Sequence, residues 1–279
     1  MRIVVTGARG ALGRPTAEYC RRMGAEVVGA DVVGGPDAGE TTQFLRADLT
    51  DLGQVYDVLD GADAVIHLAA IAAQRVYPSA KTFFTNVGMS WNVMEASARL
   101  GIKRVVLASS LQVNHTITPR TPIRYEYFPV DEDHPVSPQD DYGLSKLVGE
   151  TCANTFSRHW GLSIISFRFP FIAQEKVFEE QLPFTDPHMA HAALFTYIHV
   201  FDAARACYLA ATADLPPNSH TVLFAAARDS ALDMSSAAYA RQFFPEAEIR
   251  PGLEEYGSLL NSSRAEKLIG FVPEYSLHR

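Results

Sequence analysis

The sequence predicts an α/β fold in which helices cover both faces of one doubly wound parallel sheet. Through the first half of the chain, short apolar runs alternate with longer amphipathic segments, the pattern of repeated strand–helix units. The first run, 3–5, leads directly into a glycine-rich turn, and the second run is followed by an acidic residue, Asp31. Together these features predict a Rossmann fold, to which we add a small C-terminal substrate-binding lobe.

The individual elements follow from the apolar patterns. Strands are expected at 3–5, 26–30, 43–47, 64–68, 104–108, 163–167 and 221–225, and helices at 12–23, 52–59, 83–100, 142–159, 200–211 and 235–243. Residues 111–140 hold five prolines and no lasting period, so we expect a long surface loop there. No linker is evident. We therefore expect one domain over 1–279, with 1–168 mainly binding the cofactor and 169–279 mainly forming the substrate lobe.

The composition describes a globular protein and argues against several function classes. The chain has 279 residues, of which 47% are hydrophobic and 20% charged, enough to bury a substantial core. A formal net charge of −8 without a basic run argues against nucleic-acid binding. Three widely spaced cysteines predict neither a disulfide framework nor a zinc site. Because no signal peptide or bilayer-spanning apolar run is evident, we expect a cytoplasmic protein without a membrane partner.

The glycine-rich turn has the spacing of a dinucleotide-binding motif. Gly7 permits the tight turn, Gly10 lets the backbone approach a pyrophosphate, and Gly13 lets the following helix pack closely on the strand. Arg9, Ala11 and Leu12 complete the turn and are expected to contact the cofactor as well. The pyrophosphate would lie at the helix N-terminus, where free N–H groups favour an anion. The alternative is a glycine turn without a ligand.

Two acidic residues suggest which dinucleotide is bound. Asp31 follows Gly13 by 18 residues, where a carboxylate binds the ribose hydroxyls of NAD and repels the 2′-phosphate of NADP. Arg9 could reach such a phosphate, but no basic residue closely follows Asp31, so we favour NAD over NADP. Asp48, followed by Leu49, closes the third strand and is placed to accept a hydrogen bond from the adenine amino group. Its alternative role is that of a helix N-cap.

A tyrosine and a lysine lie four residues apart in the segment Tyr142-Gly143-Leu144-Ser145-Lys146. On a helix this spacing puts both side chains on one face. The ammonium of Lys146 would lower the pKa of the Tyr142 phenol, so that the phenol could act as a base nearer neutral pH. The alternative is an ordinary exposed pair on a helix.

These motifs, in this order, closely resemble the extended short-chain dehydrogenase/reductase family, also called the NAD-dependent epimerase/dehydratase family. Besides the motifs above, the resemblance is carried by His67-Leu68-Ala69-Ala70, Asn86, Ser109-Ser110, Arg168, 200–206 and 263–271. It implies that Tyr142 is the acid/base, that Lys146 holds the nicotinamide ribose, and that Ser110 bonds the reacting oxygen. It also implies that Leu68, Ala69, Ala70, Asn86 and Phe169 line the cofactor site, and that helices 83–100 and 142–159 form a homodimer interface.

The substrate is expected to be a small carbohydrate. Family members that act on nucleotide sugars use arginines to hold the diphosphate, whereas Lys176 is the one Lys or Arg between Arg168 and Arg205. The segments usual after the family's catalytic serine and after Arg168 are also replaced here, which leaves the substrate open. Candidate substrate contacts, besides Ser110 and Tyr142, are Arg75, Gln112, Asn114, His115 and Arg124. Arg75 could pair with a substrate carboxylate, or simply be a surface arginine.

Three hypotheses follow for the function. The first is a dehydrogenase that oxidises a hydroxyl of a small sugar, sugar acid or polyol, with short uronate dehydrogenases as the most similar type. The second is a nucleotide-sugar epimerase that keeps its NAD bound. The third is a non-catalytic NAD(P)-sensing regulator, against which the presence of both Tyr142 and Lys146 argues. His188, His191 and His199 are close in sequence but lack a matching carboxylate, so no metal site is predicted.

Overall fold

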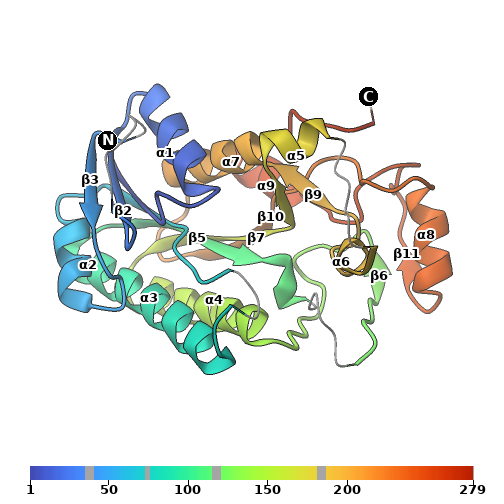
Figure 1. Ribbon diagram of the computed structural model, residues 1–279, viewed down its shortest axis with the longest axis horizontal. Coiled ribbons are helices and arrows are strands. Elements are labelled where there is room, and N and C mark those ends of the chain that lie inside the picture. Colours follow the sequence, from blue (N-terminus) through green and yellow to red (C-terminus); the bar gives the residue numbers. More distant parts are fainter. Residues whose placement is uncertain (35–40, 73–75, 115–120, 181–186, 279) are drawn as a thin grey trace.

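The computed structural model describes residues 1–34, 41–72, 76–114, 121–180 and 187–278, and at its centre lies a seven-stranded sheet. The strand order is β10-β7-β5-β4-β1-β2-β3, and every neighbouring pair is parallel (Figure 1). The strands are β1 (Arg2–Thr6), β2 (Glu26–Asp31), β3 (Gln43–Arg46), β4 (Ala64–His67), β5 (Arg104–Ser110), β7 (Ser163–Phe169) and β10 (His220–Phe224). The predicted α/β class with a doubly wound parallel sheet is confirmed.

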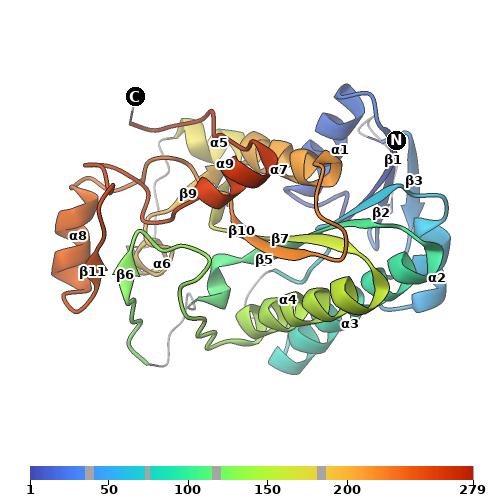
Figure 2. The same ribbon diagram turned by 180° about the vertical axis from the view of Figure 1, so that it is seen from behind.

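Helices cover both faces of this sheet (Figures 1 and 2). One face is covered by α1 (Gly13–Arg22), α7 (Val200–Thr212) and α9 (Ser263–Ile269), and the other by α2 (Leu52–Leu59), α3 (Ser79–Leu100) and α4 (Asp141–Trp160). Strand β1 shows why the sheet needs both layers. Ile3 and Val5 enter the core under α1 and α7, while Val4, between them, enters the core under α2 and α3. All three are fully buried because a central parallel strand has no solvent-facing side.

Most element boundaries agree with the sequence patterns, with two corrections. Helix α3 begins at Ser79, directly after Pro78, and not at residue 83. The side chains of its first turn are polar or exposed, so the sequence shows no apolar periodicity there. Pro78 was the available signal, because proline is well suited to a helix start. Residues 111–140 are not wholly irregular, because they contain the short 3-10 helix η1 (Leu111–Val113) and the strand β6 (Tyr127–Phe128).

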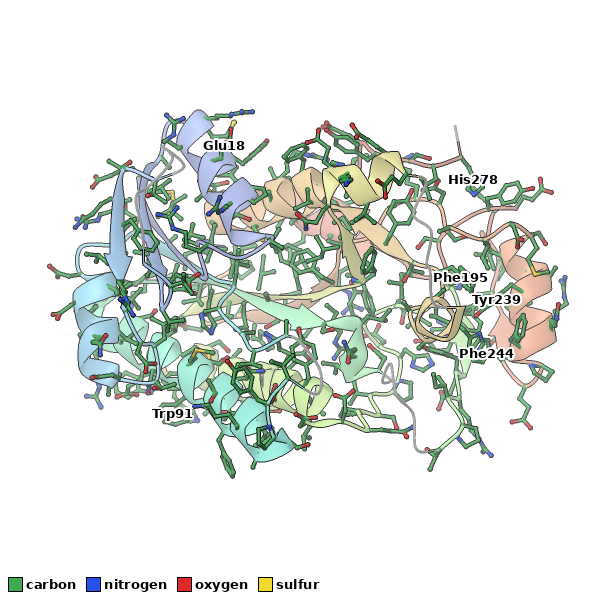
Figure 3. The ribbon with its side chains drawn as sticks, viewed as in Figure 1. Glu18, Trp91, Phe195, Tyr239, Phe244 and His278 are labelled. Atoms are coloured by element: carbon green, nitrogen blue, oxygen red, sulfur yellow. The ribbon has the colours of Figure 1, made fainter. Side chains whose placement is uncertain are left out.

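The C-terminal lobe contains short elements that the sequence patterns did not reveal. Strand β6 pairs with β11 (Glu248–Ile249), and β8 (Phe171–Ala173) pairs with β9 (Tyr197–His199). The lobe's short helices α5 (Glu175–Glu179) and α6 (Pro187–Ala192) were not expected either, whereas α8 (Ser236–Phe243) confirms the helix predicted at 235–243. An aromatic cluster holds the lobe together, and Figure 3 labels three of its members, Phe195, Tyr239 and Phe244. The lobe therefore has a core of its own beside the sheet.

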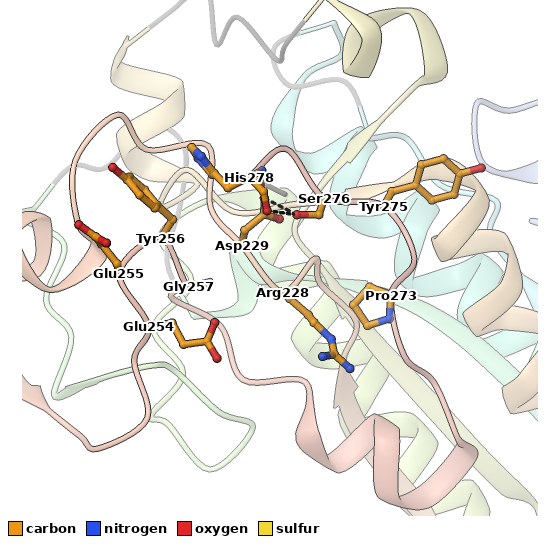
Figure 4. Close-up of a pocket in the computed structure, with 10 residues that line it drawn as sticks. All are labelled: Arg228, Asp229, Glu254, Glu255, Tyr256, Gly257, Pro273, Tyr275, Ser276 and His278. Atoms are coloured by element: carbon orange, nitrogen blue, oxygen red, sulfur yellow. Dashed lines mark hydrogen bonds between the residues drawn. The ribbon is translucent and has the colours of Figure 1, made fainter.

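Buried carboxylates fasten two irregular segments to neighbouring elements. The Glu132 carboxylate accepts a hydrogen bond from the Phe224 amide at 2.7 Å and pairs with Arg264, which ties the long loop to β10 and α9. Asp229 accepts hydrogen bonds from the Ser276 hydroxyl at 2.9 Å and the His278 amide at 2.7 Å (Figure 4). It also accepts from the Leu277 amide at 2.7 Å, and so anchors the C-terminal segment. The two carboxylates thus hold the long loop and the C-terminal segment, whose irregular backbone does not belong to the central sheet. Within the described ranges, no helix is both long enough and apolar enough to cross a bilayer.

Candidate active site

A cavity of about 770 Å³ lies at the carboxyl ends of β1, β2 and β4. The sheet order reverses between β1 and β4, and this is the position where open α/β sheets bind ligands. Its lining includes most of the predicted cofactor contacts, namely Gly7, Arg9, Gly10, Asp31, Asp48, Leu49, Leu68, Ala69 and Ala70. Its volume is in the range of small-molecule sites. Residues separated by up to 63 positions in the sequence therefore meet at one site, as the motifs predicted.

The glycine turn has the shape that an approaching diphosphate requires. Gly7 has a φ of +68°, and a Cβ there would lie 2.7 Å from the Ala69 amide nitrogen. A Cβ at Gly13 would overlap the Gly7 carbonyl, so α1 packs on the turn only because no side chain intervenes. Gly10 presents bare backbone to the cavity. Leu12, at the N-cap of α1, makes no side-chain capping bond, while the Arg14 amide donates to the Gly10 carbonyl at 3.2 Å and Pro15 carries no N–H. These residues fit a dinucleotide.

The Asp31 carboxylate lies at one end of the cavity. It accepts hydrogen bonds from the amides of Arg9 at 2.9 Å and Val33 at 3.2 Å, and it keeps further lone pairs for a ligand. The guanidinium of Arg9 lies over the Phe44 ring, 4.2 Å from its centroid. The carboxylate therefore faces the cavity at the end of β2, where the sequence placed the ribose contact.

Asp48 lies in the cavity lining and is not a helix N-cap. Its carboxylate accepts bonds from the Thr50 amide at 2.9 Å and the Thr50 hydroxyl at 2.7 Å. The N-cap of α2 is Asp51, whose side chain accepts from the amides of Gly53 and Gln54. The structure thus separates the two roles that the sequence left open for Asp48.

The cavity is also lined by residues that the sequence motifs did not indicate. They are Arg14, Val32, Val33, Gly34, Ala47, Thr50, Ile71, Tyr77, Lys81, Thr85 and Met89. Val32 and Val33 look like strand residues in the sequence, but they follow β2 and are 53% and 62% exposed. Of the predicted contacts, Ala11 is exposed and Leu12 is buried, and neither belongs to the described lining.

Tyr142 and Lys146 lie on α4 and face the end of β5. The Ser110 hydroxyl lies beside the Tyr142 phenol. Lys146 is buried, and its ammonium donates to the Ala108 carbonyl at 2.8 Å and lies 5.5 Å from the centroid of the Tyr142 ring. A Cβ at Gly143 would lie only 2.4 Å from the Gln112 carbonyl oxygen, so glycine is what allows α4 to approach this turn.

The pKa of Tyr142 corrects one expectation. Burial raises this pKa to about 12, the neighbouring Ser110 hydroxyl opposes the rise, and the negative charge of Asp140 adds to it. Burial also lowers the pKa of Lys146 to about 8. The predicted lowering of the phenol pKa by Lys146 is therefore wrong for this structure. Desolvation disfavours the charged form of both side chains.

Asn86 joins the cavity to α4. Its side-chain oxygen accepts from the Ile71 amide at 2.8 Å, and its amide nitrogen donates to the Ile71 carbonyl at 3.1 Å and to the Ser145 hydroxyl at 3.2 Å. The residue is buried and holds the cavity-lining segment after β4 against the helix that carries Tyr142. Phe169 lies opposite Ser110 in the register of β7 and β5, which places it beside the same cluster.

The remaining predicted substrate contacts differ in where the structure places them. Gln112 lies beside Ser110, since its amide donates to the Ser110 hydroxyl at 3.2 Å. Asn114 is buried, and its amide nitrogen donates to the carbonyls of His134 and Pro135, which fastens the long loop. Arg75 and His115 lie outside the described residues, and Arg124 is exposed.

The histidines take structural positions in the described ranges. His67 is fully buried at the end of β4, its Nδ1 lies 2.7 Å from the Thr6 hydroxyl, and burial together with the nearby Lys146 lowers its pKa to about 3. His191 is hydrogen-bonded to the Tyr239 hydroxyl, and His199 stacks on Tyr275. Among the residues that the structure describes, no group of three or more metal-ligating side chains comes together.

Comparisons with known proteins define the family. The family model described as "NAD dependent epimerase/dehydratase family" matches residues 3–181, so the chain belongs to this family. A uronate dehydrogenase of Pseudomonas syringae pv. tomato is 29% identical over 201 residues, which is 70% of each chain. A UDP-glucose 4-epimerase of Lacticaseibacillus casei is 28% identical over 61% of this chain and 51% of its own.

Solved structures extend the similarity to the complete fold. A short-chain dehydrogenase/reductase superfamily protein from Agrobacterium tumefaciens, solved with bound NAD, has a TM-score of 0.73 and 21% identity. The match covers 99% of this chain and 94% of that protein. The predicted family, the Rossmann-type fold and the class of enzyme, an NAD-dependent dehydrogenase or epimerase, are thereby confirmed. NAD, the predicted cofactor, is the cofactor of this family.

Proposed function

We propose that the protein is an NAD-dependent dehydrogenase that oxidises a hydroxyl group of a small free sugar, sugar acid or polyol. The observation that carries the proposal is the cluster at the end of β5, where the Lys146 ammonium lies 5.5 Å from the centroid of the Tyr142 ring and the Ser110 hydroxyl lies beside the phenol. This cluster adjoins the cofactor cavity through Asn86, which bonds both Ile71 in the lining and Ser145 next to Lys146. A proton-accepting phenol next to a dinucleotide cavity is what alcohol oxidation requires.

Each residue has a definite task in this reaction. The glycine turn and the N-terminal end of α1 would hold the diphosphate, and Asp31 would accept hydrogen bonds from the ribose hydroxyls. NAD+ supplies the hydride acceptor. Tyr142 as phenolate takes the hydroxyl proton of the substrate, and Ser110 donates a hydrogen bond to the same oxygen and so orients it. The ammonium of Lys146 favours the phenolate electrostatically whenever both groups are charged.

The charges near the site favour a small substrate over a nucleotide sugar. A sugar diphosphate needs arginine forks or an open helix N-terminus. Lys176, the one Lys or Arg between Arg168 and Arg205, is 85% exposed and pairs with Glu180 at the C-terminal end of its helix. Arg168 is bound by Glu150, and Arg205 by Asp202. The similarity to a uronate dehydrogenase supports the same choice.

NADH formation tests this proposal. Purified protein is mixed with NAD+ and a panel of uronic acids, aldoses and polyols, and the absorbance of NADH is followed. Tyr142→Phe is the control, because it removes only the hydroxyl and leaves the ring and Lys146 in place. We expect NADH with at least one uronic acid or aldose, and a rate about 10²- to 10⁴-fold lower for the variant. No NADH with any panel member would contradict the proposal.

A nucleotide-sugar 4-epimerase is the second candidate, supported by the similarity to the UDP-glucose 4-epimerase of Lacticaseibacillus casei. The same tyrosine, serine and lysine would serve, but the hydride would return to the sugar. Interconversion of UDP-glucose and UDP-galactose without net NADH would establish this candidate and exclude the first.

We infer further that the protein is a homodimer. Phe84 and Trp91 lie two turns apart on α3 and are 70% and 47% exposed, and Leu144 on the neighbouring α4 is 43% exposed. Large apolar side chains gathered on two packed helices are typical of a protein–protein contact. A two-fold partner would cover this face with the same face of its own.

A further inference from the structure

Helix α4 is hydrogen-bonded to the end of β5 on two successive turns, and the turn before them lies beside the same strand. Tyr142, Lys146 and Glu150 follow one another at intervals of four residues and therefore share one helix face. Hydrogen bonds join Lys146 to Ala108 at 2.8 Å and Glu150 to the Ser109 hydroxyl at 2.6 Å, and Tyr142 lies beside the Ser110 hydroxyl. Three consecutive strand residues thus each adjoin one of three consecutive helix turns.

The last of these turns is held from a second strand. Arg168 on β7 donates to both carboxylate oxygens of Glu150, from Nε at 3.0 Å and from Nη2 at 2.8 Å. In the sheet register, Arg168 lies directly opposite Ser109. Glu150 is therefore bonded to β5 and β7 together, at adjacent positions, which fixes the helix in rotation and translation relative to both strands.

The ion pair is poorly suited to a role in stability alone. Both side chains are only 5% exposed, so each charge has lost its hydration. Within the described part of the chain, Nη1 of Arg168 is buried without a hydrogen-bond partner. Well-packed apolar side chains in place of such a pair often leave a protein equally stable or more so. What an apolar pair cannot supply is directional bonding to Ser109 beside the reacting groups.

We propose that Glu150 and Arg168 are positioning residues of the active site, which act through Ser109 to set the distance between Tyr142 and Ser110. The inference rests on the proposed role of Tyr142. Neither residue touches the substrate or the cofactor in this account. Their contribution is geometric, and a displacement of reacting groups by about 1 Å can lower a rate about 100-fold.

Two mild substitutions test the proposal. Ser109→Ala removes the link to the strand without leaving a buried charge unpaired. Glu150→Gln keeps an acceptor oxygen for Ser109 but removes the charge that orients Arg168. We expect kcat to fall about tenfold or more in both variants, while the Kd for NADH stays within about twofold of the wild-type value. Ser163→Ala is the matched control, because its hydroxyl is equally buried and donates to the Pro216 carbonyl at the opposite end of β7.

The outcomes separate positioning from stability. A lower melting temperature with unchanged kcat in both variants would overturn the proposal and leave the pair a structural one. Crystal structures of the wild type and both variants give a readout that needs no substrate. We expect the Tyr142 phenol to lie beside the Ser110 hydroxyl in the wild type and to move away from it in the variants, and an unaltered Ser110–Tyr142 distance in both variants would also overturn the proposal. If the wild type turns over no sugar, the proposed function fails separately, and these structures still decide the positioning role.

Discussion

The pH dependence of the reaction follows from the raised pKa of Tyr142 and the lowered pKa of Lys146. Oxidation needs Tyr142 as phenolate and Lys146 as ammonium in the same molecule. With the pKa of Tyr142 near 12 and that of Lys146 near 8, this form is rare at neutral pH, about one molecule in 10⁵. Its population rises about tenfold per pH unit while lysine stays charged, and it levels off once lysine begins to lose its proton.

The expected increase in kcat/KM for NAD+ is therefore about 50-fold between pH 6 and pH 8, and only about twofold between pH 8 and pH 10. Initial rates of NADH formation at limiting NAD+ measure this quantity, since kcat/KM reports the free enzyme. Lys146→Arg is a useful control, because a guanidinium keeps its charge and should extend the rise above pH 8 at whatever rate remains. A profile that is flat or falling from pH 6 to pH 8 would refute the reasoning.

Three further predictions concern the cofactor, stability and assembly. Asp31→Ala should weaken NAD+ binding about tenfold or more and shift the ratio of affinities toward NADP+, because the carboxylate that lines the cavity is lost. Fluorescence titration measures both affinities. Equal NAD+ binding by the wild type and the variant would count against the ribose role of Asp31. Asp229→Ala should lower the free energy of unfolding by about 3 kcal/mol, since several donors of the C-terminal segment lose a buried acceptor (Figure 4). Asp233 is exposed, so the control Asp233→Ala should have little effect. Equal free energies of unfolding for the two variants in denaturant would contradict this prediction. Light scattering should give the mass of two chains for the wild type and of one chain for Phe84→Glu, and a monomeric wild type would exclude the dimer.

The sequence predicted those parts of the fold that repeat a pattern. Strands such as β1 and β5 are continuous apolar runs, and long helices such as α4 have a clear start and end. The glycine turn and Asp31 were predicted to meet, and Gly7 and Asp31 line one cavity. Gly7 and Gly13 could be found from the sequence because backbone geometry at these positions permits few other residues.

The C-terminal lobe and the electrostatics could not be predicted in the same way. Strands of two or three residues, such as β6 and β11, are too short to show a period. Helix α9 carried a usable signal in Gly270, which ends it in the left-handed conformation. The pKa of Tyr142 depends on burial by residues distant in sequence, so a four-residue spacing to Lys146 gave the wrong sign. Glu150 carried a signal as well, because it continues the spacing of Tyr142 and Lys146 by one more turn.

The molar ratio of NADH formed to sugar consumed tests the central claim most directly. With a uronic acid as the limiting reactant and NAD+ in excess, the account predicts one NADH for each sugar molecule oxidised by the wild type and none by Tyr142→Phe. Consumption of a sugar with little or no net NADH would mean that the hydride returns to the product, and would contradict the assignment as a dehydrogenase.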